Sequence, residues 1–323
     1  MPGAVDRGTH VVASNLGGGI ARHLELVRSV ITVEVLELPE RLPLLRKMEC
    51  LRGHLRKHHP RTLVSHGVAA AIAARHRGSR LKRVRHVEVW HGDPFFLAPR
   101  HRLAAYRGLA RAGLPPDLQV FTNQWLVGLF GDPRSDHQVL PNAVPDRELT
   151  PKASDVSARL AVYIGRLSPE KGYQDLLAAW PADSLARAWR LEVFGTGPLT
   201  AETRPTDVKL RHQTDDPLRV LAHADLLVVP SWTETGPYTA AEAMSVGTPF
   251  VGTRTGDMPE FLSSGCGWLV PTREPDRLRL ALMDAQQETP ENLARRGELG
   301  RQWLRTHRVF EHWASAIEGI YSL

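Results

Sequence analysis

The sequence predicts an α/β protein with two domains, and three observations lead to this fold class. The chain has 323 residues, which is enough for two α/β domains of ordinary size. Apolar runs of strand length, such as residues 224–230, alternate with helix-forming segments, as expected for parallel strands buried on both faces. Glycine-containing turns follow several of these runs, at the sheet edge where such proteins bind ligands.

Composition argues against a membrane-spanning or disulfide-rich protein. Hydrophobic residues make up 42% of the chain and charged residues 24%, which is typical of a soluble globular protein. No apolar run reaches about 18 residues, and the start of the sequence lacks a signal-peptide core, so we expect a cytoplasmic location. Cys50 and Cys266 lie far apart, which argues against a disulfide or a thiolate metal site, and we expect both to be buried.

Basic residues are concentrated in the N-terminal part. Residues 1–100 carry 17 Lys and Arg against 8 Asp and Glu, a net charge of +9 in a chain whose total is +6. Such a face attracts an acidic acceptor, an anionic lipid surface or nucleic acid; the alternative is that the arginines simply solvate the surface. His54, His58 and His59 lie on this basic part without a metal-site spacing, and we interpret them as a solvated face.

The first elements are a strand over residues 9–14, a glycine turn over 15–19, a helix over 20–30 and a strand over 31–38. Consecutive glycines let the backbone approach a ligand and expose N–H groups at the helix start. A nicotinamide-dinucleotide site is one alternative, since Glu37 lies where a ribose-binding acid is expected. Arg22 argues against it, because it occupies the position where the G-x-G-x-x-G/A fingerprint requires a small residue.

Residues 43–58 predict an amphipathic basic helix. Leu44, Met48, Leu51 and Leu55 recur at helical spacing, with arginines and lysines on the other faces. The apolar stripe either packs into the core or lies on an anionic membrane, and both alternatives stay open.

His91 is the candidate functional residue of the N-terminal half. Strands are predicted over residues 61–66, 85–90 and 119–122, with helices over 68–75 and 123–130. His91 follows the second of these strands and therefore lies at the carboxyl end of the sheet. The alternative is a histidine whose nitrogens are satisfied by loop carbonyls.

A connector over residues 139–145 leads into the second half. Ala143 stands in its turn, so this turn should not require a positive φ. A strand from Leu160 is followed by a loop that holds Arg166 and Lys171. Two cations at a strand end can stabilise the charge that develops on a leaving diphosphate; the alternative is a pair of solvated surface charges.

The remaining segments complete the second domain. Strands are predicted over residues 191–198, 208–210 and 266–270, a helix over 275–287, and two helices in the last part of the chain. Trp313, Ile317 and Tyr321 share one face of the final helix, so that helix should pack against something.

The stretch over residues 224–252 carries the strongest chemical signal. It predicts a strand over 224–230, a loop, a helix over 239–245 closed by Gly247, and a strand over 248–252. Glu234 lies in the loop and Glu242 in the helix. A carboxylate accepts hydrogen bonds from vicinal hydroxyls and a helix start attracts phosphate, so the pair suggests a nucleotide-sugar site.

Three segments carry a resemblance to a known family. Residues 231–244, SWTETGPYTAAEAM, resemble the Glu-x7-Glu signature of retaining GT-B glycosyltransferases of family 4. Residues 160–180 resemble the first strand, loop and helix of the family's nucleotide domain, and residues 139–145 resemble its interdomain connector. The resemblance implies a GT-B fold, with two Rossmann-like domains whose parallel sheets face a cleft. It assigns residues 1–143 and the C-terminal helix 307–323 to the acceptor-side domain, and 144–306 to the nucleotide-sugar domain.

The resemblance also implies roles for individual residues. Glu234 would hold hydroxyls of the donor sugar and Glu242 those of the ribose, while His91 would lie near the sugar and acceptor. The diphosphate would be held by Arg166, Lys171 and the backbone amides of Tyr238 and Thr239, and residues 213–217 fall where relatives hold the base. Glycines of the donor-binding loops complete the set: Gly18, Gly19, Gly165 and Gly236. Pro237 departs from the family pattern and donates no N–H.

The implied reaction is sugar transfer from a nucleotide-diphosphate donor to an acceptor hydroxyl with retention, the departing phosphate taking the acceptor proton. UDP-sugar is the first expected donor and GDP-sugar the second; the acceptor is a saccharide, a lipid-linked or a small molecule. No metal, cofactor or nucleic-acid partner is expected. The alternatives are a non-catalytic nucleotide-sugar-binding relative, an NAD-dependent Rossmann oxidoreductase, and a glycosidase, whose carboxyl pair would have to face one another at about 5 Å.

Overall fold

The computed structural model describes residues 8–13, 18–78, 81–94, 96–146, 159–181, 189–202, 205, 208–211 and 214–322. Gly17 of the glycine turn and Gln213 of the expected base-binding segment lie outside these residues. The chain forms two compact units, residues 1–142 with 311–323 and residues 143–310. Within the described part, no helix combines the length and apolar character needed to cross a membrane.

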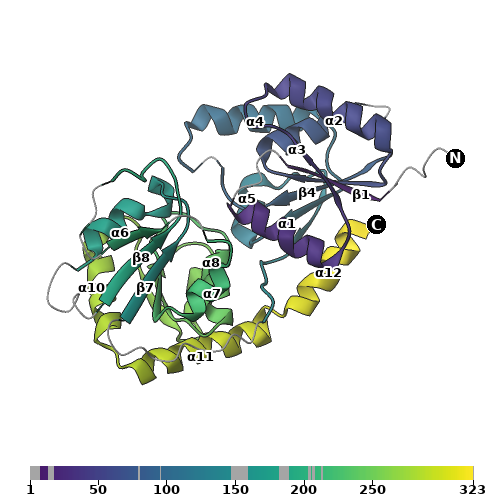
Figure 1. Cartoon of the computed structure of the whole chain (residues 1–323). Helices are drawn as coiled ribbons and strands as arrows, with labels where there is room; N and C mark the ends of the chain where they lie inside the picture. Colours follow the sequence, from purple (N-terminus) through teal and green to yellow (C-terminus); the bar gives the residue numbers. More distant parts are fainter. Residues whose placement is uncertain are drawn as a thin grey trace. The chain divides into compact units, whose positions relative to one another are not determined.

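The first unit is a parallel sheet in the order β2-β1-β3-β4-β5-β6, with helices on both faces (Figure 1). Its elements are β1 (Thr9–Ala13), α1 (Gly18–Val30), β2 (Glu34–Glu37), α2 (Leu44–His58), β3 (Thr62–His66), α3 (Val68–Arg75), β4 (Arg85–Trp90), α4 (Arg100–Ala112), β5 (Leu118–Phe121), α5 (Gln124–Phe130), β6 (Asp136–Val139) and, from residue 311 onward, α12 (Phe310–Ser322).

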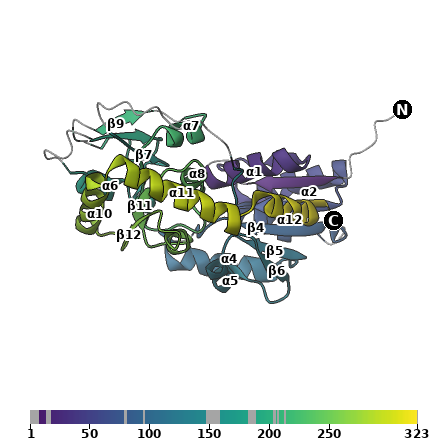
Figure 2. The ribbon, with the colours of Figure 1, turned by 90° about the horizontal axis from the view of Figure 1, so that it is seen from below.

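Helices cover both faces of the first sheet, and every residue of β1 and β3 is therefore buried. α2 and α3 lie on one face, where Leu51 and Leu55 pack with Val12 and Leu63. α1 and α12 lie on the other face, and Figure 2 shows α12 along this unit.

The apolar stripe of α2 is core. Leu51 and Leu55 are fully buried and Met48 packs against them. The apolar side chains that a membrane contact of residues 43–58 would need are therefore turned into the core. Lys47, expected on a polar face, is also buried, and its Nζ donates to the Glu40 carbonyl at 3.1 Å. Cys50, expected to be buried, is exposed on this helix, whereas Cys266 is buried as predicted.

The second unit is a parallel sheet in the order β12-β11-β10-β7-β8-β9. Its elements are β7 (Arg159–Ile164), the 3-10 turn η2 (Pro169–Lys171), α6 (Tyr173–Ala179), β8 (Trp189–Phe194), β9 (Val208–Arg211), α7 (Pro217–Ala222), β10 (Leu226–Val229), α8 (Tyr238–Ser245), β11 (Phe250–Thr253), α9 (Met258–Leu262), β12 (Gly267–Val270), α10 (Pro275–Gln287) and α11 (Pro290–His307).

The second sheet is also covered on both faces. α6 and α10 lie on one face and α7 and α8 on the other (Figure 1). The core between the sheet, α6 and α10 contains Trp180, Leu191 and Leu282. β7, β10 and β11 are neighbours near the middle of the sheet, so the loops that follow them meet at one edge.

Candidate functional site

Glu234 is the centre of the candidate site in the second unit. It follows β10, and its side chain is 12% exposed. Its Oε1 atom accepts hydrogen bonds from Lys171 Nζ at 2.7 Å and from Ser231 Oγ at 2.7 Å. Its backbone N–H donates to Thr255 Oγ1, after β11, at 3.1 Å. Three loops at the carboxyl edge of the sheet therefore hold Glu234, two of them through its carboxylate and one through its backbone.

Two glycines allow these loops to approach so closely. Gly172 has φ +65°, and a Cβ atom there would lie 1.9 Å from the Pro230 carbonyl oxygen at the end of β10. Gly256 has φ +55°, and a Cβ there would lie 2.6 Å from the Glu234 carbonyl oxygen. Trp232 N–H further donates to the Glu170 carbonyl at 2.9 Å. The backbone around Lys171 and Glu234 is thus held by contacts that only glycine permits.

Lys171 and Arg166 lie on the same loop after β7. The Lys171 side chain is 35% exposed, although its ammonium group contacts Glu234. Arg166 is exposed, and its backbone carbonyl accepts from Tyr163 Oη at 2.7 Å. Gly165 precedes it, and a Cβ there would lie 3.2 Å from the same Tyr163 oxygen. The Tyr163 hydroxyl thus holds the backbone of this loop, while the side chains of Arg166 and Lys171 are exposed and partly exposed, respectively.

α8 begins at Tyr238, with Pro237 at its N-cap. The first N–H groups of a helix have no intrahelical partner, so Tyr238 and Thr239 lie where backbone amides can bind an anion. Glu242 is buried one turn further, and Gly236 is buried just before the helix. The loop placement of Glu234 and the helix placement of Glu242 are as predicted, and Gly247 adopts φ +77°, as expected for a left-handed cap.

A cavity of about 520 Å³ lies in the second unit between α7 and β8. Phe194, Thr214, Asp215 and Arg219 are among its lining residues. Residues 214–216 of the segment that was expected to lie near the nucleotide base thus line this cavity.

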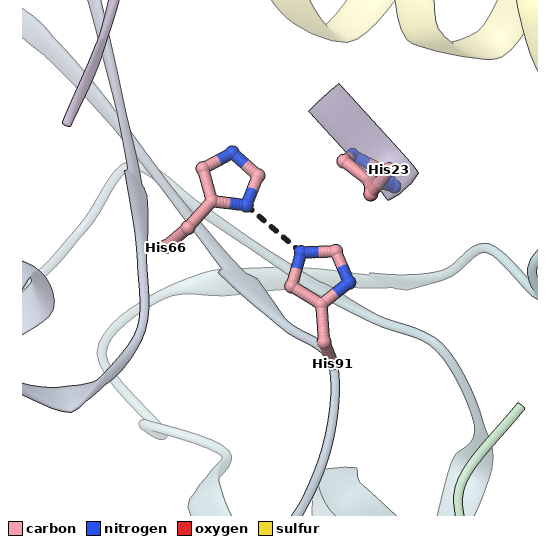
Figure 3. Close-up of side chains that lie close together, drawn as sticks. All are labelled: His23, His66 and His91. Atoms are coloured by element: carbon pink, nitrogen blue, oxygen red, sulfur yellow. Dashed lines mark hydrogen bonds between the residues drawn. The ribbon is translucent and has the colours of Figure 1, made fainter. Parts of the chain in front are cut away.

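His91 is half-buried and belongs to a histidine group in the first unit whose other two members, His23 and His66, are buried. Its Nε2 atom lies 2.8 Å from Nδ1 of His66, the last residue of β3, and this hydrogen bond is drawn in Figure 3. Tyr321 Oη of α12 lies 3.2 Å from His66 Nε2 and 3.4 Å from Nε2 of His23 on α1. The group therefore joins a chain of polar contacts from four elements.

The three histidines are held neutral. Burial lowers the pKa of His91 to about 4 and lowers the pKa values of His23 and His66 well below 6.5, with repulsion from the neighbouring histidines adding to the effect for these two. At neutral pH His91 can donate or accept a hydrogen bond but carries no positive charge.

Gly18 and Gly19 open α1 and are exposed. Gly18 has φ +58°, and no atom of the residues that the structure describes lies within 4 Å of a Cβ built on it. Residues with a side chain rarely adopt this backbone conformation.

Comparison with known proteins shows which proteins this chain resembles in sequence and in fold. Residues 158–287 match the family described as Glycosyl transferases group 1. The chain is 30% identical over 194 residues to the MMP α-(1→4)-mannosyltransferase of Mycolicibacterium hassiacum, covering 56% of this chain and 46% of that protein. It is 24% identical over 245 residues to the GDP-mannose-dependent monoacylated α-(1-6)-phosphatidylinositol monomannoside mannosyltransferase of Corynebacterium glutamicum, covering 66% and 64%. The matches thus span less than two thirds of either relative's length.

Solved structures match the whole chain. Sucrose-phosphate synthase of Thermosynechococcus elongatus superposes with a TM-score of 0.79 at 16% identity, covering 98% of each chain. Anabaena Alr3699/HepE, in complex with UDP-glucose, superposes with a TM-score of 0.75 at 17% identity, covering 97% of this chain and 99% of the other. The chain has the GT-B fold. Within this GT-B chain, residues 158–287 form the part that is similar to glycosyl transferases group 1 by sequence.

Several residues of this GT-B chain that build the two sites were not singled out from the sequence. Ser231 and Thr255 form hydrogen bonds with Glu234. Ser231 follows β10, as Glu234 does, and Thr255 follows the neighbouring strand β11. His66 ends β3 just as His91 follows β4, and the two strands are neighbours. The carboxyl ends of adjacent parallel strands meet at one edge, and this rule was the available signal.

Proposed function

We propose that the protein is a retaining glycosyltransferase of family 4, which transfers a sugar from a nucleotide-diphosphate donor to an acceptor hydroxyl. The observation that carries the proposal is the Lys171–Glu234 contact at the carboxyl edge of the second sheet, next to the start of α8. It joins a cation for phosphate and a carboxylate for sugar hydroxyls within 2.7 Å.

The donor diphosphate is proposed to bind Lys171, Arg166 and the backbone amides of Tyr238 and Thr239. The Lys171 ammonium has three N–H donors, so it can bind the diphosphate while it keeps its hydrogen bond to Glu234. These groups would stabilise the charge that develops as the sugar leaves, which is the usual form of electrostatic catalysis at phosphate. Because the cations supply this neutralisation, the proposal includes no metal or cofactor.

Glu234 is proposed to bind hydroxyls of the donor sugar, and Glu242 those of the ribose. Both hydrogen bonds to the Glu234 side chain within the described part of the chain go to Oε1. Oε2 is therefore the oxygen that we assign to a sugar hydroxyl. Since Lys171 and Ser231 hold the carboxylate in place, little side-chain entropy is lost on binding.

His91 is proposed to hydrogen-bond the acceptor hydroxyl or the transferred sugar. Its Nε2 lies 2.8 Å from His66 Nδ1. A neutral imidazole suits a hydroxyl better than a phosphate. In the proposed front-face reaction the bond from the anomeric carbon to phosphate breaks, the acceptor oxygen bonds to the same face, and the phosphate takes the acceptor proton.

UDP-sugars are the first proposed donors and GDP-sugars the second. HepE was solved with UDP-glucose, whereas the mannosyltransferase of C. glutamicum is named for GDP-mannose, so both classes have support. A saccharide, a lipid-linked molecule or a small molecule is proposed as the acceptor, and a cytoplasmic location, at most peripheral to a membrane, remains part of the proposal.

A thermal-shift panel of UDP, GDP, dTDP and ADP sugars tests the donor. A ligand at a hundred times its Kd stabilises by about 2.7 kcal/mol, so one class should stand out. Transfer is then measured with that donor for Lys171→Met and Glu234→Gln, with Lys209→Met, an exposed lysine on β9, as the matched control. The two site variants should lose most turnover while the control keeps it.

Three outcomes would count against parts of this proposal. Turnover that is unchanged in both site variants would exclude the proposed donor site. An inverted anomeric centre in the product, read by NMR coupling constants, would exclude retention. Binding of the donor without transfer to any acceptor would favour a non-catalytic nucleotide-sugar-binding protein.

A further inference from the structure

We propose that three side chains of the first unit bind one divalent transition-metal ion, with Zn²⁺ as the first candidate. The set, called here the edge cluster, consists of His10 of β1, Glu34 of β2 and His54 of α2, whose candidate ligand atoms all lie within 4.8 Å of one another. Two imidazoles and one carboxylate are ligands that suit Zn²⁺ and its neighbours in the first transition row, with water as the fourth ligand.

The fold brings these residues together from three elements. His10 and Glu34 are cross-strand partners in the parallel β1–β2 pair, so both side chains point to the same face. α2 covers that face, and His54 and His58 are four residues apart on it. The interpretation of these two histidines as a solvated face is therefore wrong, whereas His59 is exposed.

The separations of the candidate ligand atoms fit one small ion. His10 Nδ1 lies 2.8 Å from His54 Nε2 and 3.7 Å from Glu34 Oε2. Bond lengths of 2.0–2.2 Å in a tetrahedron put ligand atoms about 3.3–3.6 Å apart. The first separation is thus shorter than the liganded one by about 0.5–0.8 Å and the second is longer by about 0.1–0.4 Å, differences that side-chain rotation can supply.

Core packing holds the ligands in place. Leu51 and Leu55, one turn before His54 and His58 respectively, are fully buried and fix α2 over the sheet. The helix ends at His58, since His59 adopts a left-handed conformation with φ 48°. The side chain of His10 is 1% exposed, while those of His58 and Glu34 are 26% and 41% exposed. An ion can enter from the Glu34 side and be shielded on the His10 side.

The edge cluster contains both kinds of ligand that a divalent ion needs. A metal ion binds the neutral form of an imidazole and the ionised form of a carboxylate. Glu34 supplies the negative charge that balances a divalent ion. Lys57 is a neighbouring cation, and its positive charge opposes the binding of a metal ion.

The edge cluster is distinct from the histidine group that contains His91. His10 pairs with Leu63, three residues before His66 on β3, so roughly 10 Å of sheet separates the two groups. The His23–His66–His91 group contains no carboxylate, and its nitrogens face one another and Tyr321. A metal at the edge cluster would join α2 to the β1–β2 edge, a structural role that does not depend on the proposed transfer reaction.

Isothermal titration of Zn²⁺ into the full chain, freed of any affinity tag and treated with a chelator, tests the proposal. We expect one saturable site per chain and a higher unfolding temperature with the ion. His54→Ala and Glu34→Gln should each weaken binding at least about tenfold, since even loss of a supporting group around a metal ligand has that effect. His59→Asn removes a neighbouring imidazole outside the edge cluster and should leave binding unchanged.

Visible absorption of bound Co²⁺ gives a second readout, since its intensity reports the coordination and should change in His54→Ala. Absence of saturable binding would overturn the proposal. So would equal Zn²⁺ affinity in the wild type, His54→Ala and Glu34→Gln, or a site that is lost in His66→Asn and kept in both of these variants.

Discussion

Replacing Gly172 with alanine should destabilise the second unit by roughly 2–5 kcal/mol. The left-handed conformation, φ +65°, costs a residue with a Cβ about 1–2 kcal/mol. The new methyl group would also lie 1.9 Å from the Pro230 carbonyl oxygen. Because backbone must move to relieve that overlap, a further 1–3 kcal/mol or so is expected, as for other overpacked sites.

Gly265→Ala separates the two contributions. Gly265 also has a positive φ, +81°, but the nearest atom to its Cβ position is Leu299 Cδ1 at 3.6 Å, an ordinary contact. This control should lose only about 1–2 kcal/mol. Urea unfolding followed by far-UV circular dichroism measures both variants against the wild type. Equal losses in the two variants would refute the role assigned to the contact between Gly172 and Pro230.

The same substitution should weaken donor binding. Lys171 precedes Gly172, and Ser231 and Glu234 follow Pro230, so relief of the overlap shifts both partners of the Lys171–Glu234 contact. Nucleotide-sugar affinity should fall more in Gly172→Ala than in Gly265→Ala, measured by titration under conditions where both are folded. Unchanged affinity in Gly172→Ala would show that the proposed site tolerates the shift.

Three further predictions concern the first unit. Arg75→Met should lower the unfolding free energy by about 3–5 kcal/mol in urea titration, because it removes the bonds of 2.9 and 2.7 Å to the buried Glu88 carboxylate. The stability that depends on His91 should be complete above pH 6.5 and should fall as the pH approaches 4, because the pKa of His91 is about 4 in the folded state and unfolding lets its imidazole take up a proton. Thermal unfolding midpoints measured across this range should rise with pH, and they should rise less steeply in His91→Asn. Leu55→Ala should cost about 2–5 kcal/mol and leave vesicle co-sedimentation unchanged, because the side chain is core.

Segments with continuous apolar runs and clear turn signals were predictable from the sequence. α3, β4 and α10 have the predicted bounds, and Ala143 avoids positive φ as expected. α4 was missed because few of its side chains face the core; only Tyr106 and Ala110 are buried. β6 was missed because its residues are mostly exposed, and only its pairing with β5 defines it as a strand.

The candidate site was predictable as a set of residues but not as a network. The carboxyl ends of strands placed Glu234 and Lys171 at one edge, yet their direct contact depends on how closely Gly172 approaches Pro230. Such a distance is set by tertiary packing. His66 and His23 were outside the prediction because the group around His91 joins four elements that are far apart in the chain.

The return of α12 to the first unit has a consequence for how the protein is made. Tyr321 is fully buried beside His66, and its carbonyl accepts a hydrogen bond from Thr9 Oγ1. During synthesis on the ribosome, residues 1–142 therefore emerge long before the helix that covers one face of their sheet. The second unit is continuous in sequence and can finish folding first. Until α12 has been synthesised and has packed on the sheet, residues 1–142 expose an apolar surface of the kind that chaperones bind.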